Sequence, residues 1–230
     1  MKNNYLYIKL LSLMFVAINI QANVPEGSFT SLHVKAKDVN AYVEYMKNNT
    51  GVFKAIDSDV AGVCVVKTGN EYPGEMFVWN AFPSVEKAFM TSELYDPFDA
   101  PKEFNKLRKV LYSVTWKPLK EFELSPGYER LWRIKTTDSR AFAKEMTKLE
   151  KAVAKAGHNM RFGVFEPMGG GTETIHLRVV TDTAAENGKV VDEYYAGASY
   201  GEIWDEAFAK YVTDVVRETT EFCEVIYTKK

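Results

Sequence analysis

Residues 30–36 and 130–136 alternate between apolar and polar side chains, the pattern of a β-strand with one buried face. An aspartate follows each segment at the same distance. Asp38 and Asp138 are both suited to begin a helix, because a carboxylate accepts hydrogen bonds from the free N–H groups of the first turn. The apolar residues that come next recur at helical spacing, at Val39, Tyr42, Val43 and Met46 and again at Phe142, Met146, Leu149 and Val153. A strand followed by a helix is therefore predicted at two places in the chain.

Further elements follow in the same order after each of these helices. Two strands joined by a glycine-containing turn are predicted at 62–68 and 75–82, and again at 160–166 and 174–180. A helix is then predicted around two runs of apolar residues, Phe104, Leu107 and Leu111 in one place and Trp204, Phe208, Val212 and Val215 in the other. A closing strand is predicted at 113–121 and at 221–228. The expected order is β-α-β-β-α-β, twice.

The two series of elements indicate an internal duplication with a spacing of about 100 residues. Identical residues recur at this spacing around the first strand and helix of each copy: Lys35 and Lys135, Asp38 and Asp138, Ala41 and Ala141, Met46 and Met146. Pro126 and Gly127 mark the boundary between the copies. We therefore expect a first repeat at 23–125 and a second at 126–230, after a leader at 1–22.

Each predicted repeat has the order of a ferredoxin-like unit, an α+β fold in which helices cover one face of an antiparallel sheet. One copy leaves the other face of its sheet bare, and two copies cover each other. Over residues 29–229 the chain resembles the dimeric α/β-barrel superfamily, which includes antibiotic-biosynthesis monooxygenase-like and NIPSNAP-like domains. The resemblance implies two repeats packed sheet to sheet as a barrel within one chain. It also implies ligand binding, or monooxygenase-like or isomerase-like catalysis that often needs no metal or organic cofactor.

Composition narrows the function classes. The 230 residues are 46% hydrophobic, which is enough for a packed core and excludes a disordered or collagen-like chain. Lys and Arg number 29 against 31 Asp and Glu, and this balance argues against a general nucleic-acid or anionic-membrane partner.

Residues 1–22 have the pattern of a secretory signal peptide. Lys2 and Lys9 provide positive charge, residues 10–20 an apolar run, and Ala22 a small residue suited to cleavage. The apolar run is shorter than the ~20 residues that span a bilayer. A buried first helix or an uncleaved anchor is the alternative. We expect an exported protein, periplasmic or secreted, that is a monomer or weak homodimer and does not contact the membrane after cleavage.

The two cysteines, Cys64 and Cys223, each lie in a strand-like run. An oxidising compartment allows a disulfide between them. Their apolar neighbours fit small buried side chains equally well, and two unpaired buried thiols are the favoured interpretation. The chain has no C-x-x-C motif, so redox and zinc chemistry are not indicated.

Strand alternation places several basic residues of the second copy on the sheet face that is not covered by helices. With their counterparts in the first copy, the candidate ligand-binding residues are His33, Lys35, Asn80, Arg133, Arg161, His176 and Arg178. Guanidinium groups suit carboxylates and phosphates, so this face predicts a pocket for a small acid. The alternative is a partly solvated face, or one neutralised by Glu166, Glu173, Glu221 or Glu224. A shift of the alternation by one residue would invert the assignment.

Three functions fit this pattern. The favoured one is an exported protein that binds a small, possibly anionic ligand inside the barrel. The second is a cofactor-independent monooxygenase-like or isomerase-like enzyme, in which Arg133, His176 and Arg178 polarise and protonate the substrate and Asn80 orients it. The third is an interaction protein whose barrel is filled with side chains. No histidine has a metal-ligand companion at short spacing, so neither a metal nor a cofactor is predicted.

Overall fold

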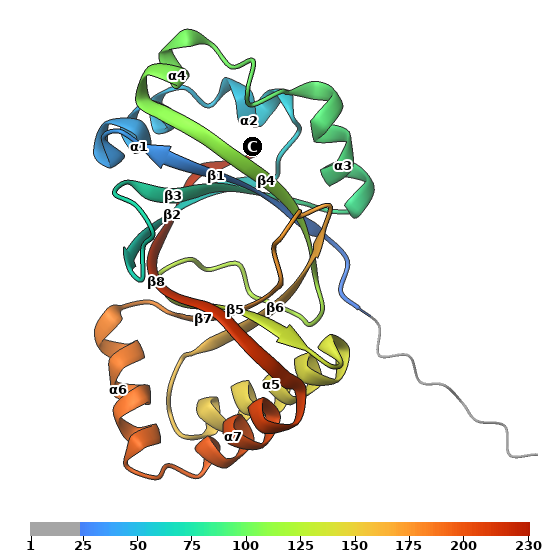
Figure 1. Ribbon diagram of the computed structural model, residues 1–230, viewed down its shortest axis with the longest axis vertical. Helices are drawn as coiled ribbons and strands as arrows, with labels where there is room; N and C mark the ends of the chain where they lie inside the picture. The colour runs from blue at the N-terminus through green and yellow to red at the C-terminus, as the bar shows by residue number, and fades with distance from the viewer. Residues whose placement is uncertain (1–23) are drawn as a thin grey trace, which may run out of the picture.

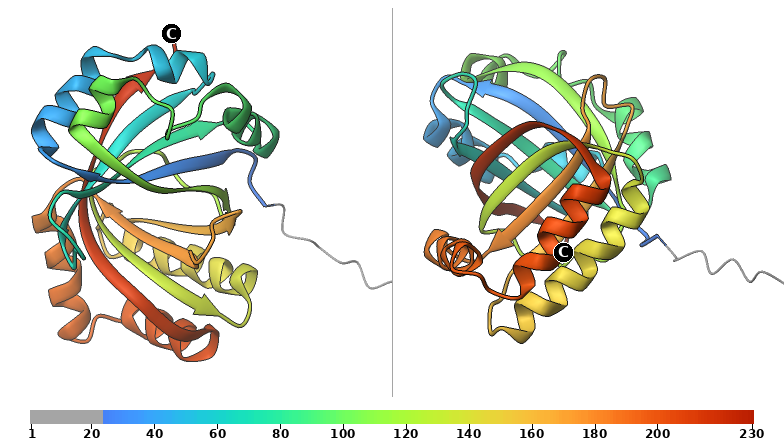
Figure 2. Two further views of the ribbon diagram at one scale, coloured as in Figure 1. Left: turned by 45° about the horizontal axis from the view of Figure 1, so that its top comes forward. Right: turned by 60° about the horizontal axis from the view of Figure 1, so that its bottom comes forward.

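The computed structural model describes residues 24–230, and the predicted signal peptide lies outside the described residues. Eight antiparallel strands form a closed barrel in the order β1-β3-β2-β8-β5-β7-β6-β4 (Figure 1). Helices cover the barrel from two opposite sides (Figure 2). The predicted α+β barrel is confirmed. Within residues 24–230, none of the helices has the length and apolar character needed to cross a membrane.

The elements divide into two halves along the chain. The first half contains β1 (Ser28–Ala36), α1 (Val39–Asn48), α2 (Gly51–Ala55), β2 (Val60–Thr68), β3 (Glu75–Phe82), α3 (Val85–Leu94), α4 (Lys102–Leu107) and β4 (Arg108–Pro118). The second half contains β5 (Tyr128–Thr136), α5 (Ser139–Lys155), β6 (Arg161–Met168), β7 (Ile175–Thr181), α6 (Ala184–Tyr195), α7 (Tyr200–Tyr211) and β8 (Val212–Thr228). The strand order within the halves is β4-β1-β3-β2 and β8-β5-β7-β6, and pairing of β2 with β8 and of β4 with β6 closes the barrel.

The two predicted helix starts are confirmed. The carboxylate of Asp38 accepts a hydrogen bond from the N–H of Ala41 at 3.0 Å, and Asp138 accepts one from Ala141 at 2.9 Å. α5 ends next to Gly157, whose φ of 94° lies in the left-handed region that favours glycine.

The apolar stripes of strands and helices meet outside the barrel, where they form one core in each half. Residues such as Val34, Tyr42 and Met46 belong to the first core, and Ile134 and Phe142 to the second. The barrel interior has smaller apolar clusters, built from these aromatic residues: Phe29, Phe77, Trp79, Trp116, Phe122 and Phe165. Phe122 and Leu124 come from the connection between β4 and β5, so this connection helps to fill the interior.

Two helices end earlier than the sequence predicts. α4 stops at Leu107, which places Leu111 in β4, and α7 stops at Tyr211, which places Val212 and Val215 in β8. The predicted continuation of the helices is wrong, because Arg108 and Val212 already pair with the last residues of β1 and β5. Strand pairing between distant segments outweighs the local spacing of apolar residues.

The expectation of unpaired thiols is also wrong. Cys64 in β2 and Cys223 in β8 face each other across the strand pair and form a disulfide over a sequence separation of 159 residues. β2 and β8 become neighbours only when the barrel closes, and the local sequence of either strand does not reveal this pairing.

Candidate functional site

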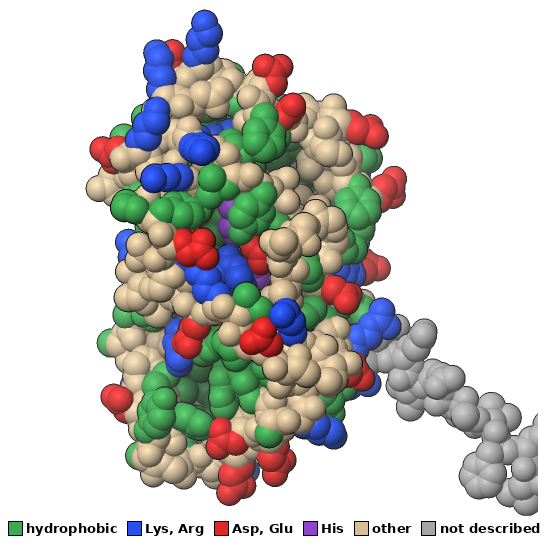
Figure 3. All heavy atoms as spheres, in the orientation of Figure 1, with side chains coloured by type: hydrophobic (Ala, Val, Ile, Leu, Met, Phe, Trp, Pro, Cys, Tyr) green, Lys and Arg blue, Asp and Glu red, His purple; other side chains and the backbone are tan. Residues whose placement is uncertain are grey.

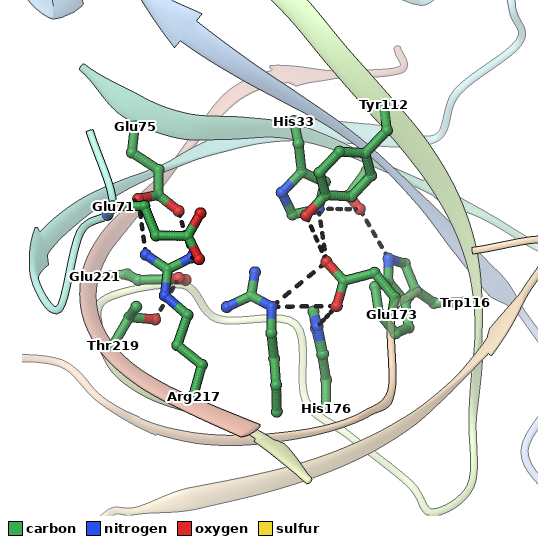
Figure 4. A network of polar contacts seen from close by, with 12 residues as sticks. His33, Glu71, Glu75, Tyr112, Trp116, Glu173, His176, Arg217, Thr219 and Glu221 are labelled. Atoms are coloured by element: carbon green, nitrogen blue, oxygen red, sulfur yellow. Dashed lines mark hydrogen bonds and ion pairs between the residues drawn. The ribbon is translucent and has the colours of Figure 1, made fainter. Parts of the chain in front are cut away.

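Polar side chains from both halves meet inside the barrel. Figure 3 looks onto one end of the barrel, where basic, acidic and histidine side chains gather in the middle of the face. Figure 4 shows this group from close by, with Glu173 at its centre between His33, Tyr112 and His176. We call these residues, together with Arg133, the Glu173 cluster.

Glu173 is the acceptor on which this cluster converges. It lies in the turn between β6 and β7, and its side chain is only 5% exposed. Its carboxylate accepts hydrogen bonds from the Tyr112 hydroxyl at 2.6 Å, from Nε of Arg133 at 3.1 Å and from Nε2 of His176 at 2.9 Å. Burial favours a raised pKa for Glu173, but the hydrogen bonds from His176 and Tyr112 and the charge of Arg133 outweigh it and lower the pKa. Glu173 is therefore a carboxylate.

The two histidines of the cluster are neutral. Burial, together with the nearby arginines, lowers the pKa of His33 to about 3 and that of His176 well below its usual value, although Glu173 opposes both shifts. His176 lies against the ring of Trp116, with a centroid distance of 3.9 Å. Since Nε2 of His176 donates to Glu173, its Nδ1 is the unprotonated nitrogen.

A serine fixes the other histidine. Ser31 Oγ accepts a hydrogen bond from Nε1 of Trp116 at 2.8 Å, so its own hydroxyl hydrogen is free to donate to Nε2 of His33 at 3.1 Å. His33 also stacks on Tyr112, with ring centroids 4.3 Å apart. Both histidine rings are thus held by protein groups on two sides.

Deeper in the barrel, Arg178 is shared by two buried glutamates. Its Nη1 donates to Glu129 at 2.7 Å and lies 3.4 Å from Glu221, which also accepts from Thr219. Burial raises the pKa of Glu129, while Arg178 opposes the shift. The guanidinium of Arg178 stacks on Phe77 at 4.9 Å. This cation is neutralised by protein carboxylates and has no need of a ligand.

A third arginine, Arg217 of β8, is equally well paired. Its two terminal nitrogens donate to the carboxylate of Glu75 at 2.7 and 2.8 Å, a bidentate pair, and it also binds the carbonyl of Gly69 (Figure 4). The sequence pattern does not reveal Arg217, because it predicts a helix for the residues near 215. Glu75 begins the predicted strand 75–82, and its parity with Phe77 could have placed it in the interior. Once β8 is known to begin at Val212, alternation from Cys223 places Arg217 on the interior face.

The structure brings together His33, Arg133, His176 and Arg178 inside the barrel, as alternation predicts. Arg161 has the same strand parity as Phe165 on the interior face, but it lies at the end of β6 and pairs with Asp182 at 3.0 Å. The other two candidates lie elsewhere. Lys35 is exposed, above the ring of Tyr72. The placement of Asn80 is wrong: it lies on the helix-covered face of β3 beside Thr30, because β3 and β7 correspond at a spacing of 99 residues, and a shift of one residue reverses the face.

The sequence also allowed the basic residues to be neutralised by glutamates. Two of the four glutamates named there do so: Glu173 pairs with Arg133, and Glu221 with Arg178. Tyr112, Trp116 and Glu129 were not among the candidates. Alternation alone could have placed Glu129, since it has the same parity as Arg133 on β5.

Two features of the interior bear on ligand binding. Nη1 of Arg133 is buried and has no hydrogen-bond partner among the described residues. A cavity of about 50 Å³ lies beside His176, Arg178 and the aromatic residues of the interior, and Arg133 and Glu173 do not line it. Its size admits a molecule of only a few atoms.

Four interior residues offer candidate metal ligands within 4.8 Å of one another: Cys64, Glu129, Glu221 and Cys223. The two sulfurs are joined in the disulfide, and both carboxylates bind Arg178. This group is therefore satisfied by protein contacts.

No protein-family model matches the chain, and no curated protein matches it significantly. Several solved structures do. A proposed monooxygenase from Lactobacillus acidophilus NCFM is 12% identical with a TM-score of 0.59, over 87% of this chain and 95% of that one. The chain has the dimeric α/β-barrel fold. A haem-binding protein from Thermus thermophilus is 9% identical (87% and 92% covered, TM-score 0.52), and an anthrone oxidase-like protein is 11% identical (88% and 95% covered, TM-score 0.52). Identities this low establish the barrel fold alone.

Proposed function

We propose that this barrel protein is exported and binds a small monocarboxylate at the Glu173 cluster. The observation that carries the proposal is Nη1 of Arg133, a buried cationic donor without a partner among the described residues. A buried donor left unsatisfied costs free energy, and a carboxylate on a ligand is the natural acceptor for a guanidinium. Arg133, Arg178 and Arg217 are all paired with carboxylates, but of these three only Arg133 also has a buried nitrogen without a hydrogen-bond partner among the described residues, so we place the ligand site at Arg133 and its neighbours.

The ligand takes the place of the Glu173 carboxylate. Glu173 already balances the single positive charge of Arg133, so a ligand that takes its place keeps the charge balance of the buried site. The turn that carries Glu173 contains Gly169 and Gly171, with φ values of 70° and 63°, and side chains added at either position would meet nothing within 4 Å. A turn of this kind has room to move and so to withdraw Glu173.

A haem group, suggested by one of the similar folds, does not fit the barrel interior. The cavity beside His176 is only about 50 Å³. Nε2 of His176 is bound to Glu173, and Nε2 of His33 is bound to Ser31. Neither histidine has a free Nε2 on an open space of haem size.

Acid–base catalysis is a second candidate function, favoured by His176. Its ring is oriented by the bond to Glu173, and it lines the small cavity, so a substrate placed there would meet a positioned imidazole. The third candidate, an interaction protein with a filled barrel, is favoured by the small volume of the same cavity.

The proposed organisation has two ferredoxin-like repeats, 23–125 and 126–230, and the common strand order of the two halves supports it. Export rests on the signal-like residues 1–22, and the Cys64–Cys223 disulfide supports an oxidising compartment. A barrel closed within one chain supports a monomer or weak homodimer. No nucleic-acid partner and no membrane contact of the cleaved chain are proposed.

Titration calorimetry of residues 23–230 with formate, acetate and propionate tests the proposed function. We expect Arg133→Met to weaken binding by about tenfold or more, since a charge-assisted hydrogen bond is lost. Lys135→Met is the matched control, because Lys135 lies two residues away on β5 and forms an exposed pair with Asp214. Undiminished binding by a folded Arg133→Met variant would place the ligand elsewhere. Absence of binding to the unmodified protein would favour the filled barrel.

A further inference from the structure

A second cavity lies outside the barrel, between the sheet of the first half and the helices that cover it. Its volume is about 360 Å³, compared with about 50 Å³ for the interior cavity. The sheet side is formed by β1, β3 and β4, for example by Leu32 and Val78, and the helix side by residues such as Phe53 and Phe104. We call it the outer cavity. Its size and apolar lining are those of a small-molecule site.

Arg108 is a buried cation in the wall of the outer cavity. Its exposure is 5%, and its guanidinium donates to the hydroxyls of Tyr42 and Tyr95 and, at 3.5 Å, to the carbonyl of Pro97. Burial raises the pKa of Tyr42 to about 12, so this phenol is neutral. Arg108 makes no ion pair with any described carboxylate, and its Nε has no hydrogen-bond partner among the described residues. Asp96 also lines the cavity, but it is exposed and forms no ion pair with Arg108.

A positive charge in this position has only partial compensation. The rings of Phe104 and Tyr42 lie 5.1 and 5.6 Å from the guanidinium, which gives a modest cation–π attraction. Aromatic faces and neutral hydroxyls do not replace a counter-charge at a buried site. Among the described residues, no carboxylate therefore contacts the buried guanidinium of Arg108 in the wall of the outer cavity.

A second polar group in the same wall is incompletely bonded. Asn80 is 8% exposed, and its Nδ2 reaches Thr30 at 3.4 Å while its Oδ1 has no partner among the described residues. If the amide were turned over, the Thr30 hydroxyl would donate to the oxygen and the NH₂ group would lack a partner. Either orientation leaves one amide atom available to a ligand.

The second half shows that the fold does not require these polar residues. β1 of the first half corresponds to β5 of the second. Arg108 pairs with Ala36 of β1, and its counterpart Val212 pairs with Thr136 of β5. In the same way Asn80 pairs with Thr30, and its counterpart Val179 pairs with Arg130. Both counterparts pack in the apolar core of the second half. Arg108 and Asn80 thus add polarity at positions where the same architecture is satisfied by valine.

The outer cavity is also bordered by exposed aromatic residues. Phe89 of α3 is 51% exposed and Phe98 is 64% exposed, and both line the cavity. Large apolar side chains exposed next to a cavity are typical of a binding site. A ligand that bridges the wall and the rim needs a charged head for Arg108 and an apolar body for the two phenylalanines.

We propose that the outer cavity is a binding site for an amphipathic monocarboxylate, with its head at Arg108 and its aliphatic or aromatic body towards Phe89 and Phe98. A single negative charge matches the single guanidinium of Arg108, whereas a dianionic phosphate would leave a charge uncompensated. This site does not depend on the Glu173 cluster, because the two lie on opposite faces of the sheet and recognise acids of different size.

Calorimetry of residues 23–230 with octanoate, and with octanol as the neutral analogue, tests the site. We expect Arg108→Leu to weaken octanoate binding by about tenfold or more and to leave octanol binding largely unchanged, because only the charge interaction is lost. Phe89→Ser, which removes an apolar contact of the ligand body at the exposed rim, gives a smaller loss. Arg130→Leu is the matched control, since Arg130 borders the equivalent cavity of the second half and pairs with Glu218 at 2.6 Å.

Several results would overturn the proposal. One is no saturable octanoate binding by the unmodified protein. Another is undiminished binding by folded Arg108→Leu and Phe89→Ser variants. Octanoate binding that is lost in Arg133→Met instead would move the ligand to the barrel interior. If Arg108→Leu fails to fold, Phe89→Ser at the exposed rim decides alone, with an unchanged octanoate affinity counting against the site.

Discussion

At the scale of single residues, the interior shows how donors and burial compete for the ionisation of a carboxyl group. Three donors reach Glu173, and its pKa falls below the ordinary value. Glu129 shares one guanidinium with Glu221, and burial raises its pKa. The histidines follow burial and stay neutral. The charge state of the barrel is therefore set by local pairing and depends little on net charge.

Lowering the pH from 7 to 5 is expected to reduce the free energy of unfolding. Histidines of the unfolded chain titrate near their ordinary pKa of 6.5, whereas in the barrel the pKa of His33 is about 3 and that of His176 is also well lowered. Below pH ~6.5 the unfolded chain binds protons that the folded barrel does not, which costs up to about 1.4 kcal/mol per pH unit for each histidine. Glu173, with its lowered pKa, adds a loss in the same direction at lower pH. Urea denaturation at pH 7, 6 and 5 measures the effect.

The variants His33→Gln and His176→Gln show how much each histidine contributes to the pH dependence of the free energy of unfolding. Each removes one titrating ring, so each should flatten the fall between pH 7 and 5. An unchanged slope in both variants would mean that other groups cause the fall.

Removing the Glu173 carboxylate should strongly destabilise the barrel. Glu173→Ala leaves Arg133 buried without a counter-charge, and such a loss costs ~3–5 kcal/mol. Formate or acetate, which supply a carboxylate to the vacated place, should raise the melting temperature of this variant more than that of the unmodified protein. Glu166→Ala, at a residue of β6 without an ion pair among those described, is the control and should change little. Equal responses of all three proteins to acetate would contradict an anion site at Arg133.

At the scale of elements, alternation in strands is the most informative signal in the sequence. By itself it places His33, Arg133, His176 and Arg178 on the face that lines the barrel. Glu173 can be named only as one of several neutralising acids, because a turn residue has no alternation to orient it. Arg217 escapes prediction because the apolar spacing of α7 continues into β8, and only pairing with β5 ends the helix. Local patterns specify faces, while element ends and contacts across the barrel depend on the tertiary structure.

The turn before Glu173 has space for side chains at its glycines, but the positive φ angles there disfavour any residue other than glycine. Gly169→Ala and Gly171→Ala meet no atom within 4 Å, yet both residues have positive φ, so each substitution is expected to cost ~1 kcal/mol. Gly51→Ala is the matched control: it also has open surroundings, without a positive φ, and should be neutral or stabilising. Thermal denaturation compares the three, and equal melting temperatures would show that the turn relaxes without strain.

At the scale of the whole molecule, two unequal seams close the barrel. β2 pairs with β8 from Val60 to Thr68, and this seam carries the disulfide. β4 pairs with β6 only from Thr115 to Pro118. The shorter seam ends at Met168, directly before the turn that carries Glu173. The weakest closure of the barrel therefore lies next to the group that the proposed ligand displaces.

Hydrogen exchange should reveal this difference between the seams. We expect backbone amides that join β4 and β6 to exchange faster than those that join β2 and β8, because few pairs hold the shorter seam together. The double variant Cys64→Ala, Cys223→Ala should lose ~2–4 kcal/mol of stability, and its exchange should rise most at the β2–β8 seam. Pairs between β5 and β7, within one half, serve as the internal reference. Equal protection of both seams in the oxidised protein would mean that the barrel opens as one unit and that the β4–β6 seam is not the weaker closure.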